Sequence, residues 1–472
     1  MSVIPQDHLE RLVGWGGAVE SVGYVFRPTT PDGIKEVFRL AKETGRKVTL
    51  RGAGRSYGDA SIGAESIVLE ITRMNRILDW DPSTGIITCE PGVTIEQLWK
   101  YCIPDGWWPA VVPGTMYPTL AGCLGMNIHG KNNFHAGPIG DHVLSFEFLS
   151  PNGVLHRVTR EDDPELFYSA ISSFGMLGCF TSITLQMKKV YSGLLDIKVL
   201  VANDLHDLFE IYNKHIEESD YLVGWVDAFA SGKQLGRAVV HQANYLKDGE
   251  DSRVAQTLRV ENQMLPDMIL GFFPKSAMWI VMKPFVNNVG MKVTNWSKMF
   301  SSKIPFLPKS YKQSHAAFAF LLDYVPGWKK SYGKGGLIQY QSFIPKETAE
   351  EVYRKQFELC QAEGLVPYLA VFKRHRPDKF LISHAVDGYS LALDFKVTKK
   401  NRERLWKLCH KLNDIVLAGG GRFYFAKDAT LRSEDLSYLG EEVIAKLKKL
   451  KSSLDPDGLL ETDLSKRLFG SK

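Results

Sequence analysis

The stretch Arg51-Gly52-Ala53-Gly54-Arg55-Ser56-Tyr57-Gly58-Asp59 decides the fold. It follows a short run, Lys47–Leu50, that predicts a strand, and it is dense in small residues. Closely spaced backbone N–H groups in such a loop can form a nest for a pyrophosphate, although the same composition is typical of a plain tight turn. A second predicted strand, Ile67–Ile71, follows where a dinucleotide-binding Gly-x-Gly-x-x-Gly unit would have a helix. The loop also lacks the Gly-Lys-Ser/Thr of a P-loop.

The sequence on either side of this loop predicts an α+β unit over roughly the first 190 residues. Pro31–Thr44 predicts a helix with one apolar face, and Ile86–Glu90 predicts another strand. Thr94 with Gln97 three residues later predicts a capped helix that runs to Tyr101. Val143–Leu149 and Val154–Thr159 flank a Pro-Asn-Gly turn and predict a hairpin.

A second glycine-rich segment, Pro113–Gly140, has little periodicity, and we expect it to be irregular. Such a long irregular stretch inside a compact domain usually has a function. Its glycines allow the backbone to approach a flat ligand closely, while its threonines and asparagines offer short polar contacts. His129 within it can donate a hydrogen bond to a ligand, although a lone histidine is more often structural.

From about Ser192 the pattern changes to strands that alternate with helices. Lys346–Glu363 and Lys400–Leu417 predict the helices, so we expect an antiparallel sheet with helices on one face. On one strand Gln339 and Gln341 share a side, which suits recognition of sugar hydroxyls, yet spacing alone favours a solvent-facing pair. The predicted strands are Tyr221–Phe229, Ala238–His241, Leu337–Phe343, Tyr368–Lys373 and Ser390–Phe395.

The segment Glu261–Phe306 is rich in methionine and phenylalanine and contains four prolines, which predicts a lid or loop rather than a core element. It can shield an apolar ligand, touch a bilayer surface, or simply pack on its own domain. The apolar residues concerned are Met264, Leu265, Met268, Ile269, Leu270, Phe272, Phe273, Met278 and Trp279.

Composition excludes several classes of function. The 472 residues carry a net charge of +5, and no basic run with interleaved aromatics indicates nucleic-acid binding. None of the six cysteines forms a Cys-x-x-Cys pair, so we expect no metal site, and scattered single cysteines fit a reducing compartment. Met1–Trp15 lacks the apolar region of a signal peptide, and no apolar run is long enough to span a membrane. We therefore expect a cytoplasmic protein, with peripheral contact to the inner membrane as an open alternative.

Three motifs, "RGAGRSYGD", "PGT…TLAGCLGMNIHGKN" and "GMLGCFTSITL", resemble the vanillyl-alcohol-oxidase (PCMH-type) family of FAD proteins. Further motifs resemble those members of the family that act on a lipid-linked pentose. These are "GWG" at Gly14–Gly16, "LGR" at Leu235–Arg237, "QYQSFIP" at Gln339–Pro345, "VFK" at Val371–Lys373 and "GGRFYFAKDA" at Gly420–Ala429. The similarity spans nearly the whole chain and preserves the order of the motifs.

The resemblance implies an α+β fold: a PCMH-type FAD-binding domain of two α+β subdomains and an antiparallel-sheet substrate domain. Residues 1–191 would form the FAD-binding domain, 192–418 the substrate domain, and 419–472 a C-terminal segment that completes the FAD-binding domain. The implied cofactor-binding residues are Gly52, Ala53, Gly54, Arg55, Ser56, Tyr57, Gly58, Gly114, Thr115, Thr119, Gly122, Gly125, Asn127, His129, Gly130, Gly178, Ile183 and Tyr424.

Some members of the family attach the flavin to a histidine of the first glycine-rich loop. The matching position here is Arg55, which supplies no nucleophile, so we expect FAD to be held non-covalently. A second departure concerns the strand around Tyr389–Phe395, where some members have a cysteine and this chain has Ala392. Thiol-directed reagents should therefore find no cysteine at that position.

The implied activity is that of an FAD-dependent oxidoreductase acting on CH–OH donors. It would oxidise the C2 hydroxyl of polyprenylphosphoryl-β-D-ribose to a 2-keto sugar, the first half of an epimerisation to arabinose, with an NAD(P)H-dependent keto-sugar reductase as partner. Lys427, Tyr57 and His129 would be catalytic, and the substrate would contact Lys131, Gln339, Gln341, Lys373 and Lys427. The alternatives are an aldonolactone or alditol oxidase acting on a soluble sugar, and a flavin-binding protein without turnover.

Overall fold

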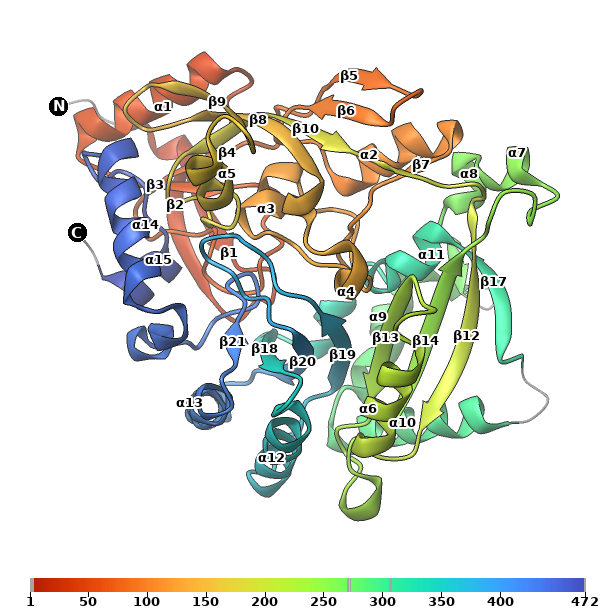
Figure 1. Cartoon of the computed structure of the whole chain (residues 1–472). Coiled ribbons are helices and arrows are strands. Elements are labelled where there is room, and N and C mark those ends of the chain that lie inside the picture. The colour runs from red at the N-terminus through yellow and green to blue at the C-terminus, as the bar shows by residue number, and fades with distance from the viewer. Residues whose placement is uncertain (1–3, 270, 272, 305–307, 471–472) are drawn as a thin grey trace.

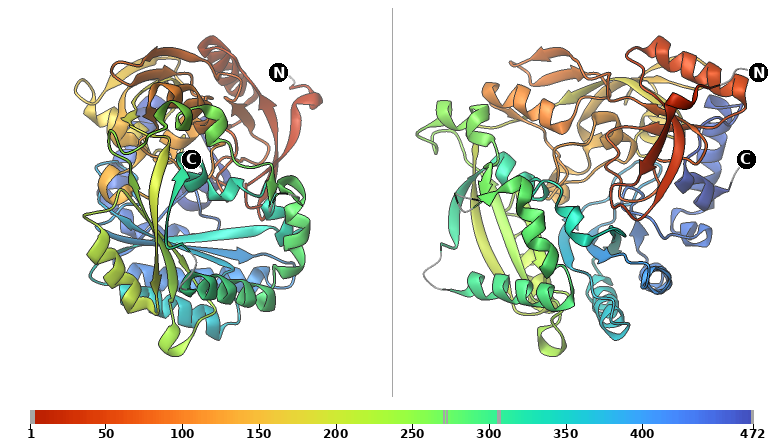
Figure 2. Two further views of the ribbon diagram at one scale, coloured as in Figure 1. Left: turned by 90° about the vertical axis from the view of Figure 1, so that its right-hand side faces the viewer. Right: turned by 180° about the vertical axis from the view of Figure 1, so that it is seen from behind.

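Two structural bodies face each other in the computed structural model, which describes residues 4–269, 271, 273–304 and 308–470 (Figure 1). One body combines the N-terminal sheets with the C-terminal helices, and the other is built on an eight-stranded sheet. Two further views show the same division (Figure 2).

The first N-terminal sheet has the strand order β1-β2-β4-β3. Its strands are β1 (Leu9–Val13), β2 (Glu20–Phe26), β4 (Ile67–Glu70) and β3 (Val48–Arg51), and β4 runs parallel to both β2 and β3. The predicted helix is confirmed as α1 (Pro31–Thr44), which buries one apolar face. The Thr30 side chain caps its first turn, and Gly45 ends it with a left-handed φ of 64°.

The second N-terminal sheet is antiparallel throughout, in the order β5-β6-β10-β8-β9. The predicted hairpin is confirmed as β8 and β9, and the predicted capping box of Thr94 and Gln97 starts helix α2. The elements of this part are β5 (Ile77–Asp81), β6 (Ile86–Cys89), α2 (Ile95–Cys102), β7 (Trp107–Trp108), β8 (Val143–Leu149), β9 (Leu155–Thr159), α5 (Pro164–Ala170), β10 (Cys179–Gln186) and β11 (Lys188–Lys189).

The segment Pro113–Gly140 is less irregular than its sequence predicts. It contains α3 (Leu120–Gly125) and α4 (Asn133–Ala136). The Thr119 hydroxyl accepts a hydrogen bond from the Gly122 N–H at 3.3 Å, which caps α3. The expectation failed because two glycines within six residues suppress the helical periodicity of α3, whereas buried packing of Leu120, Cys123 and Leu124 stabilises it.

The eight-stranded antiparallel sheet confirms the pattern predicted for the second half of the chain. Helices α6 (Leu205–His215), α12 (Ala349–Ala362) and α13 (Arg402–Ala418) pack on one face. In spatial order the strands are β17 (Ser310–Ser314), β12 (Leu194–Ala202), β14 (Ala238–Tyr245), β13 (Tyr221–Val226), β19 (Leu369–His375), β20 (Gly388–Lys396), β18 (Leu337–Pro345) and β21 (Arg422–Phe423). The opposite face is turned toward the N-terminal body, and helix α10 (Asn288–Lys303) packs on its β12 and β14 strands beside Trp225. The expectation of helices on one face alone is therefore wrong for this part of the sheet.

The expectation that Glu261–Phe306 lacks core elements was wrong for its second half. Helix α10 (Asn288–Lys303) packs on β12 and β14. None of the four prolines falls within this helix, and the Asn287 side chain caps its first turn, which allows a long uninterrupted helix. The first half holds short elements: β15 (Met268–Ile269), β16 (Phe273–Pro274) and α9 (Met278–Met282). Leu270, Phe272 and Phe306 lie outside the described residues.

The C-terminal segment joins both bodies. Strand β21 pairs with β18 of the eight-stranded sheet, whereas α14 (Glu441–Leu454) and α15 (Asp463–Phe469) return to the first sheet. There the Val48 N–H donates to the Leu459 carbonyl at 2.7 Å, and the Glu461 N–H donates to the Val48 carbonyl at 2.9 Å. Residues distant in sequence are thereby fixed beside the first glycine-rich loop.

One arginine connects these parts. Arg467 of α15 donates two hydrogen bonds to the carboxylate of Asp59, at 2.8 and 2.9 Å, and a third to Asp428 at 2.8 Å. Asp59 ends the first glycine-rich loop and Asp428 follows Lys427 directly, so two carboxylates that would repel each other share one guanidinium.

We predict that Arg467→Met lowers the free energy of unfolding by about 3 kcal/mol near neutral pH, because it leaves two neighbouring buried carboxylates without a counter-charge. Urea titration of the flavin-loaded protein measures this loss. The loss should shrink as the pH falls, because burial raises the pKa of Asp59 and its protonation relieves the repulsion between the two groups in the folded state. Arg39→Met removes an exposed cation with its own two carboxylate partners and serves as the control. A loss no larger than that of the control would contradict the prediction.

Candidate functional site

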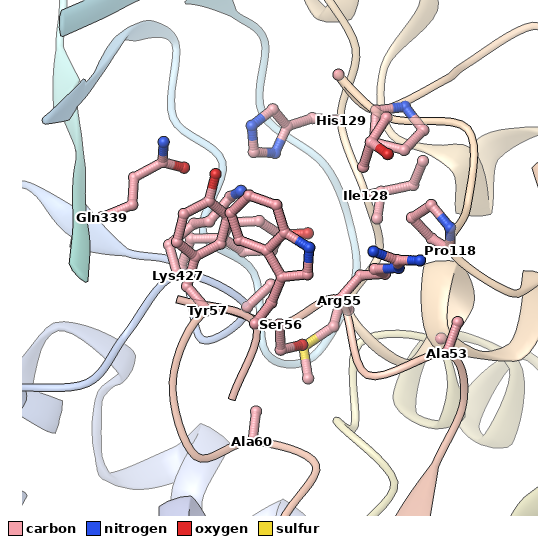
Figure 3. A pocket seen from close by; sticks show the side chains of 18 of the residues that line it. Ala53, Arg55, Ser56, Tyr57, Ala60, Pro118, Ile128, His129, Gln339 and Lys427 are labelled. Atoms are coloured by element: carbon pink, nitrogen blue, oxygen red, sulfur yellow. The ribbon is translucent and has the colours of Figure 1, made fainter. Parts of the chain in front are cut away.

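A cavity of about 370 Å³ lies between the eight-stranded sheet and the glycine-rich segments (Figure 3). It is lined by four parts of the chain that are far apart in sequence. These are the first glycine-rich loop, the segment from Val112 to Lys131, the turn from Phe174 to Phe180, and Tyr424 to Lys427. Strands β13, β14, β18, β19 and β20 close the other side with side chains from one face of the sheet.

The first glycine-rich loop is shaped for close approach of a ligand. A Cβ at Gly52 would lie 2.2 Å from the Thr119 hydroxyl, and Gly54 has a left-handed φ of 63°. Every residue from Gly52 to Tyr57 lines the cavity. Gly58 does not, because it packs against the backbone of Asp428, whose carbonyl oxygen would lie 1.7 Å from an added Cβ.

The structure places most of the expected cofactor-binding residues at the cavity wall. The second glycine-rich segment contributes Gly114, Thr115, Thr119, Gly122, Gly125 and His129, and the more distant parts contribute Gly178 and Tyr424. Besides Gly58, three residues of the expected set lie behind the wall. The side-chain Oδ1 of Asn127 accepts from the Gly140 N–H at 3.0 Å, and Gly130 packs against the Asn132 side chain. Ile183 of β10 is fully buried in the core.

Both glutamines of β18 are buried and face the cavity, so the solvent-facing alternative was wrong. The Gln339 amide donates to the Asp394 carboxylate at 2.5 Å. The Gln341 amide donates to His129 Nε2 at 3.2 Å and to the Ser390 hydroxyl at 3.3 Å. The pairing of β18 with β20 places Gln339 directly opposite Asp394, its hydrogen-bond partner. It places Gln341 opposite Ala392, two residues from its partner Ser390. Ala392 itself lines the cavity.

The hydrogen bonds of His129 define its tautomer. Since its Nε2 accepts from Gln341, its Nδ1 carries the proton and donates to His384 Nε2 at 3.0 Å. Burial, together with Lys373 and the neighbouring imidazoles, holds the pKa of His129 well below its ordinary value. Burial likewise lowers the pKa of His384 to about 3. His129 is therefore an oriented, uncharged ring at neutral pH.

Lys427, Tyr57 and Asp394 form a second group beside the cavity. The Lys427 ammonium lies 3.8 Å from the centre of the Tyr57 ring. Burial lowers the pKa of Lys427 to about 7, Asp394 opposes this shift, and Lys373 adds to it. Burial raises the pKa of Asp394 to about 7 against the hydrogen bond from Gln339. Asp394 was not anticipated from the sequence, although it follows Ala392 by two residues on the same face of β20.

Cations dominate the sheet side of the cavity. Burial lowers the pKa of Lys131 to about 7 and that of Lys373 to about 8. Lys131 donates to the carbonyl groups of Phe318 and Ala319, so part of its donor capacity is already used. Lys298 of α10 and His241 of β14 line the same region and were not anticipated. The aromatic and methionine pattern around Lys298 had suggested a lid, not a ligand-facing lysine.

The wall suits a flat ligand with polar edges. Within the part of the chain that the structure describes, the Arg55 Nε and the Tyr57 hydroxyl are buried without a hydrogen-bond partner, and both residues line the cavity. The Tyr57 hydroxyl lies near the Gln339 amide but does not reach standard hydrogen-bond geometry. Unpaired polar atoms beside a glycine-lined wall indicate that the missing partners come from a ligand. The described residues include no cluster of three or more potential metal ligands.

Comparisons with known proteins agree with this geometry. Residues 22–159 match the sequence model of a protein family that is described as an FAD binding domain. The chain is 30% identical over 468 residues to decaprenylphosphoryl-β-D-ribose oxidase of Mycolicibacterium smegmatis, with 97% of each chain covered. It is 23% identical over 475 residues to a putative D-arabinono-1,4-lactone oxidase of Neurospora crassa, covering 94% of this chain and 83% of that one. A shorter match is to L-gulonolactone oxidase of Bos taurus, with 23% identity over 196 residues, which cover 42% of this chain and 43% of that one.

We predict that acid denaturation releases all of the flavin into the supernatant. Arg55 occupies the loop position where a nucleophile would be needed, and its guanidinium lies 5.0 Å from the Tyr117 ring centre. Cys179, which also lines the cavity, stays a thiol because burial raises its pKa to about 12. Absorbance of the supernatant and fluorescence of the washed pellet measure the partition. A pellet that stays yellow would contradict non-covalent binding.

Proposed function

The chain belongs to the PCMH-type (vanillyl-alcohol-oxidase) family of FAD-binding oxidoreductases, and from this premise we propose that it oxidises the C2 hydroxyl of a polyprenylphosphoryl-β-D-ribose to a 2-keto sugar. FAD is its cofactor, and its chemistry is that of an oxidoreductase acting on CH–OH donors. The 2-keto product corresponds to the first half of an epimerisation to arabinose.

The charge of the cavity is the observation that carries this proposal. Among the described residues that line it, Lys131, Lys298, Lys373 and Lys427 supply ammonium groups, and none is an aspartate or glutamate. A phosphodiester carries a negative charge that such a wall favours, because burial reduces the screening by water. Gln339 and Gln341 on the same side offer amide groups to sugar hydroxyls.

Gly52 to Tyr57 and the glycines of the second segment would hold the cofactor, which accepts a hydride from the substrate carbon when bound. We propose that Lys427 takes the hydroxyl proton, because the lowered pKa makes its amine available near neutral pH. Tyr57 and the uncharged His129 would orient the reacting hydroxyl. Tyr57 is suited to donate, because burial raises its pKa well above the ordinary value and keeps its proton in place.

A soluble-sugar alternative, oxidation of an aldonolactone or alditol, is supported by the likeness to the Neurospora protein. These substrates carry no phosphate, so they give no role to the lysines on the sheet side. The lipid-linked substrate accounts for both the amides and the cations, and we therefore favour it.

We further propose that separate parts of the chain bind the cofactor and the substrate. Residues 1–191 and 419–472 would hold FAD, and residues 192–418 would hold the substrate. We propose that a partner enzyme, an NAD(P)H-dependent keto-sugar reductase, then reduces the 2-keto product. Because a prenyl tail partitions into lipid, the substrate would be met at a membrane surface. None of the helices among the described residues is both long and apolar enough to cross a membrane.

The direct test is anaerobic addition of a short-chain prenylphosphoryl ribose to the flavin-loaded protein. We expect the visible flavin absorbance to bleach, whereas a soluble aldonolactone should leave it unchanged. Bleaching by the lactone alone would shift the function to the soluble-sugar alternative. A protein bleached by neither substrate would contradict the proposed oxidation.

We predict that Lys427→Ala keeps its bound flavin but loses about 10²- to 10⁴-fold in the rate of bleaching, the usual contribution of a positioned acid–base group. Stopped-flow absorbance measures this rate. Lys400→Ala changes an exposed lysine that does not line the cavity and should behave as wild type. An unchanged rate in Lys427→Ala would remove Lys427 from the mechanism.

We predict that Asp394→Asn moves the pH profile of the bleaching rate about one unit toward lower pH. The rate should rise through the pKa of Lys427, because only the neutral amine accepts a proton. The Asp394 carboxylate raises that pKa, so its removal lets the amine deprotonate at lower pH. Asparagine retains a carbonyl oxygen for the Gln339 amide, which preserves the hydrogen bond. A profile that stays in place would show that Asp394 does not tune Lys427.

A further inference from the structure

Helix α10 carries an apolar stripe on its outer face. Val289, Val293, Trp296 and Phe300 follow one another at helical spacing, and each is between 54% and 74% exposed. The Trp296 and Phe300 rings stack with their centres 5.3 Å apart. Single exposed apolar residues are ordinary, but four in register on one helix are not.

The neighbouring elements extend this stripe. Ile280 and Val281 of α9, and Phe285 just before α10, are also more than two-fifths exposed. We call the whole set the α9–α10 face. It consists of Ile280, Val281, Phe285, Val289, Val293, Trp296 and Phe300.

The opposite side of α10 is anchored to the rest of the protein. The Asn295 side chain accepts a hydrogen bond from Trp225 Nε1 at 2.9 Å, and Met299 is buried. Lys298 lies over the Trp225 ring and lines the cavity. The helix therefore has a fixed orientation, in which its inner side borders the cavity and its apolar stripe faces outward.

The mouth of the cavity lies close to this helix. Leu321 lines the cavity and is half exposed, so the cavity reaches the surface there. Its neighbour Leu322 packs in one cluster with Val286 and Met291, which flank the N-terminal turn of α10. The apolar face and the cavity mouth are thus parts of one region.

The charge around the α9–α10 face has a single sign. From Met268 to Leu322 the sequence contains no aspartate or glutamate, and it contains the lysines Lys275, Lys283, Lys292, Lys298, Lys303, Lys309 and Lys312. Lys275 pairs with Asp267, whereas no carboxylate among the described residues lies within 4.0 Å of Lys283, Lys292 or Lys309. An apolar stripe of Trp, Phe and Val beside free lysines matches an anionic lipid surface.

We propose that the α9–α10 face docks on an anionic phospholipid bilayer and brings the cavity mouth to the lipid headgroups. A second copy of the chain fits this face less well, because two such faces would bring lysines against lysines. The link to a prenyl-linked substrate rests on the proposed function, whereas docking itself does not.

The test is vesicle flotation of the full-length, flavin-loaded protein. We expect binding to phosphatidylcholine vesicles that contain phosphatidylglycerol, weaker binding to pure phosphatidylcholine, and weakening by salt. The double variant Trp296→Glu/Phe300→Glu should lose about tenfold or more in partitioning, because two charges replace apolar surface that would enter the bilayer. The control variant Leu78→Glu/Tyr101→Glu changes two equally exposed apolar residues elsewhere and should bind as wild type.

A second variant, Lys283→Gln/Lys292→Gln, leaves the apolar stripe intact and should lose binding selectively for anionic vesicles. Equal partitioning of wild type and the Trp296/Phe300 variant would overturn the proposal. So would a wild-type dimer, seen by sedimentation, that the same variant dissociates, because the face would then join two copies. Bleaching by a water-soluble short-chain substrate is measured in parallel. Its absence would contradict the proposed function without affecting the vesicle result.

Discussion

The guanidinium of Arg467 between Asp59 and Asp428 is the interaction on which the site depends. One carboxylate ends the glycine-rich loop that faces the ligand, and the other follows the lysine that we assign to proton transfer. Without the cation the two carboxylates would repel each other. The backbone reinforces this closure, because the Tyr57 N–H donates to the Ala426 carbonyl at 2.8 Å. The C-terminal helix is therefore part of the site, although its side chains do not line the cavity.

The lowered pKa values of His129 and Lys427 depend on the same contact between the loops, because that contact helps to bury both groups. Burial holds His129 neutral and brings the pKa of Lys427 near 7, and Asp394 is the carboxylate that opposes this shift. Low-dielectric surroundings strengthen each of these effects relative to water. The result is a wall on which one amine can exchange a proton while the other lysines favour an anion. Helix α10 continues this pattern outward, with Lys298 on its inner side and an apolar stripe on its outer side.

Much of the fold was predictable because its signals are local. Thr30 and Pro31 start α1 and Gly45 ends it, Thr94 and Gln97 form a capping box, and the Pro-Asn-Gly turn joins β8 to β9. These features depend on hydrogen bonds and side-chain periodicity within a few residues. Where glycines or prolines interrupt the pattern, the same reasoning missed both α3 and α10. In both helices, tertiary packing outweighs local propensity.

The sequence by itself determined the chemistry available: two glycine-rich segments, Gln339 and Gln341 on one strand side, and Lys427 beside Asp428. It also indicated, through its motifs, the family to which the chain belongs. Only the tertiary structure decided that the glutamines are buried, that Asp394 faces Gln339, and that Gly58, Asn127, Gly130 and Ile183 stand behind the wall. The reason is physical. Burial, the pKa of Lys427 and the partner of a buried amide depend on atoms brought together by strand pairing and helix packing, and these atoms are tens to hundreds of residues apart in the chain.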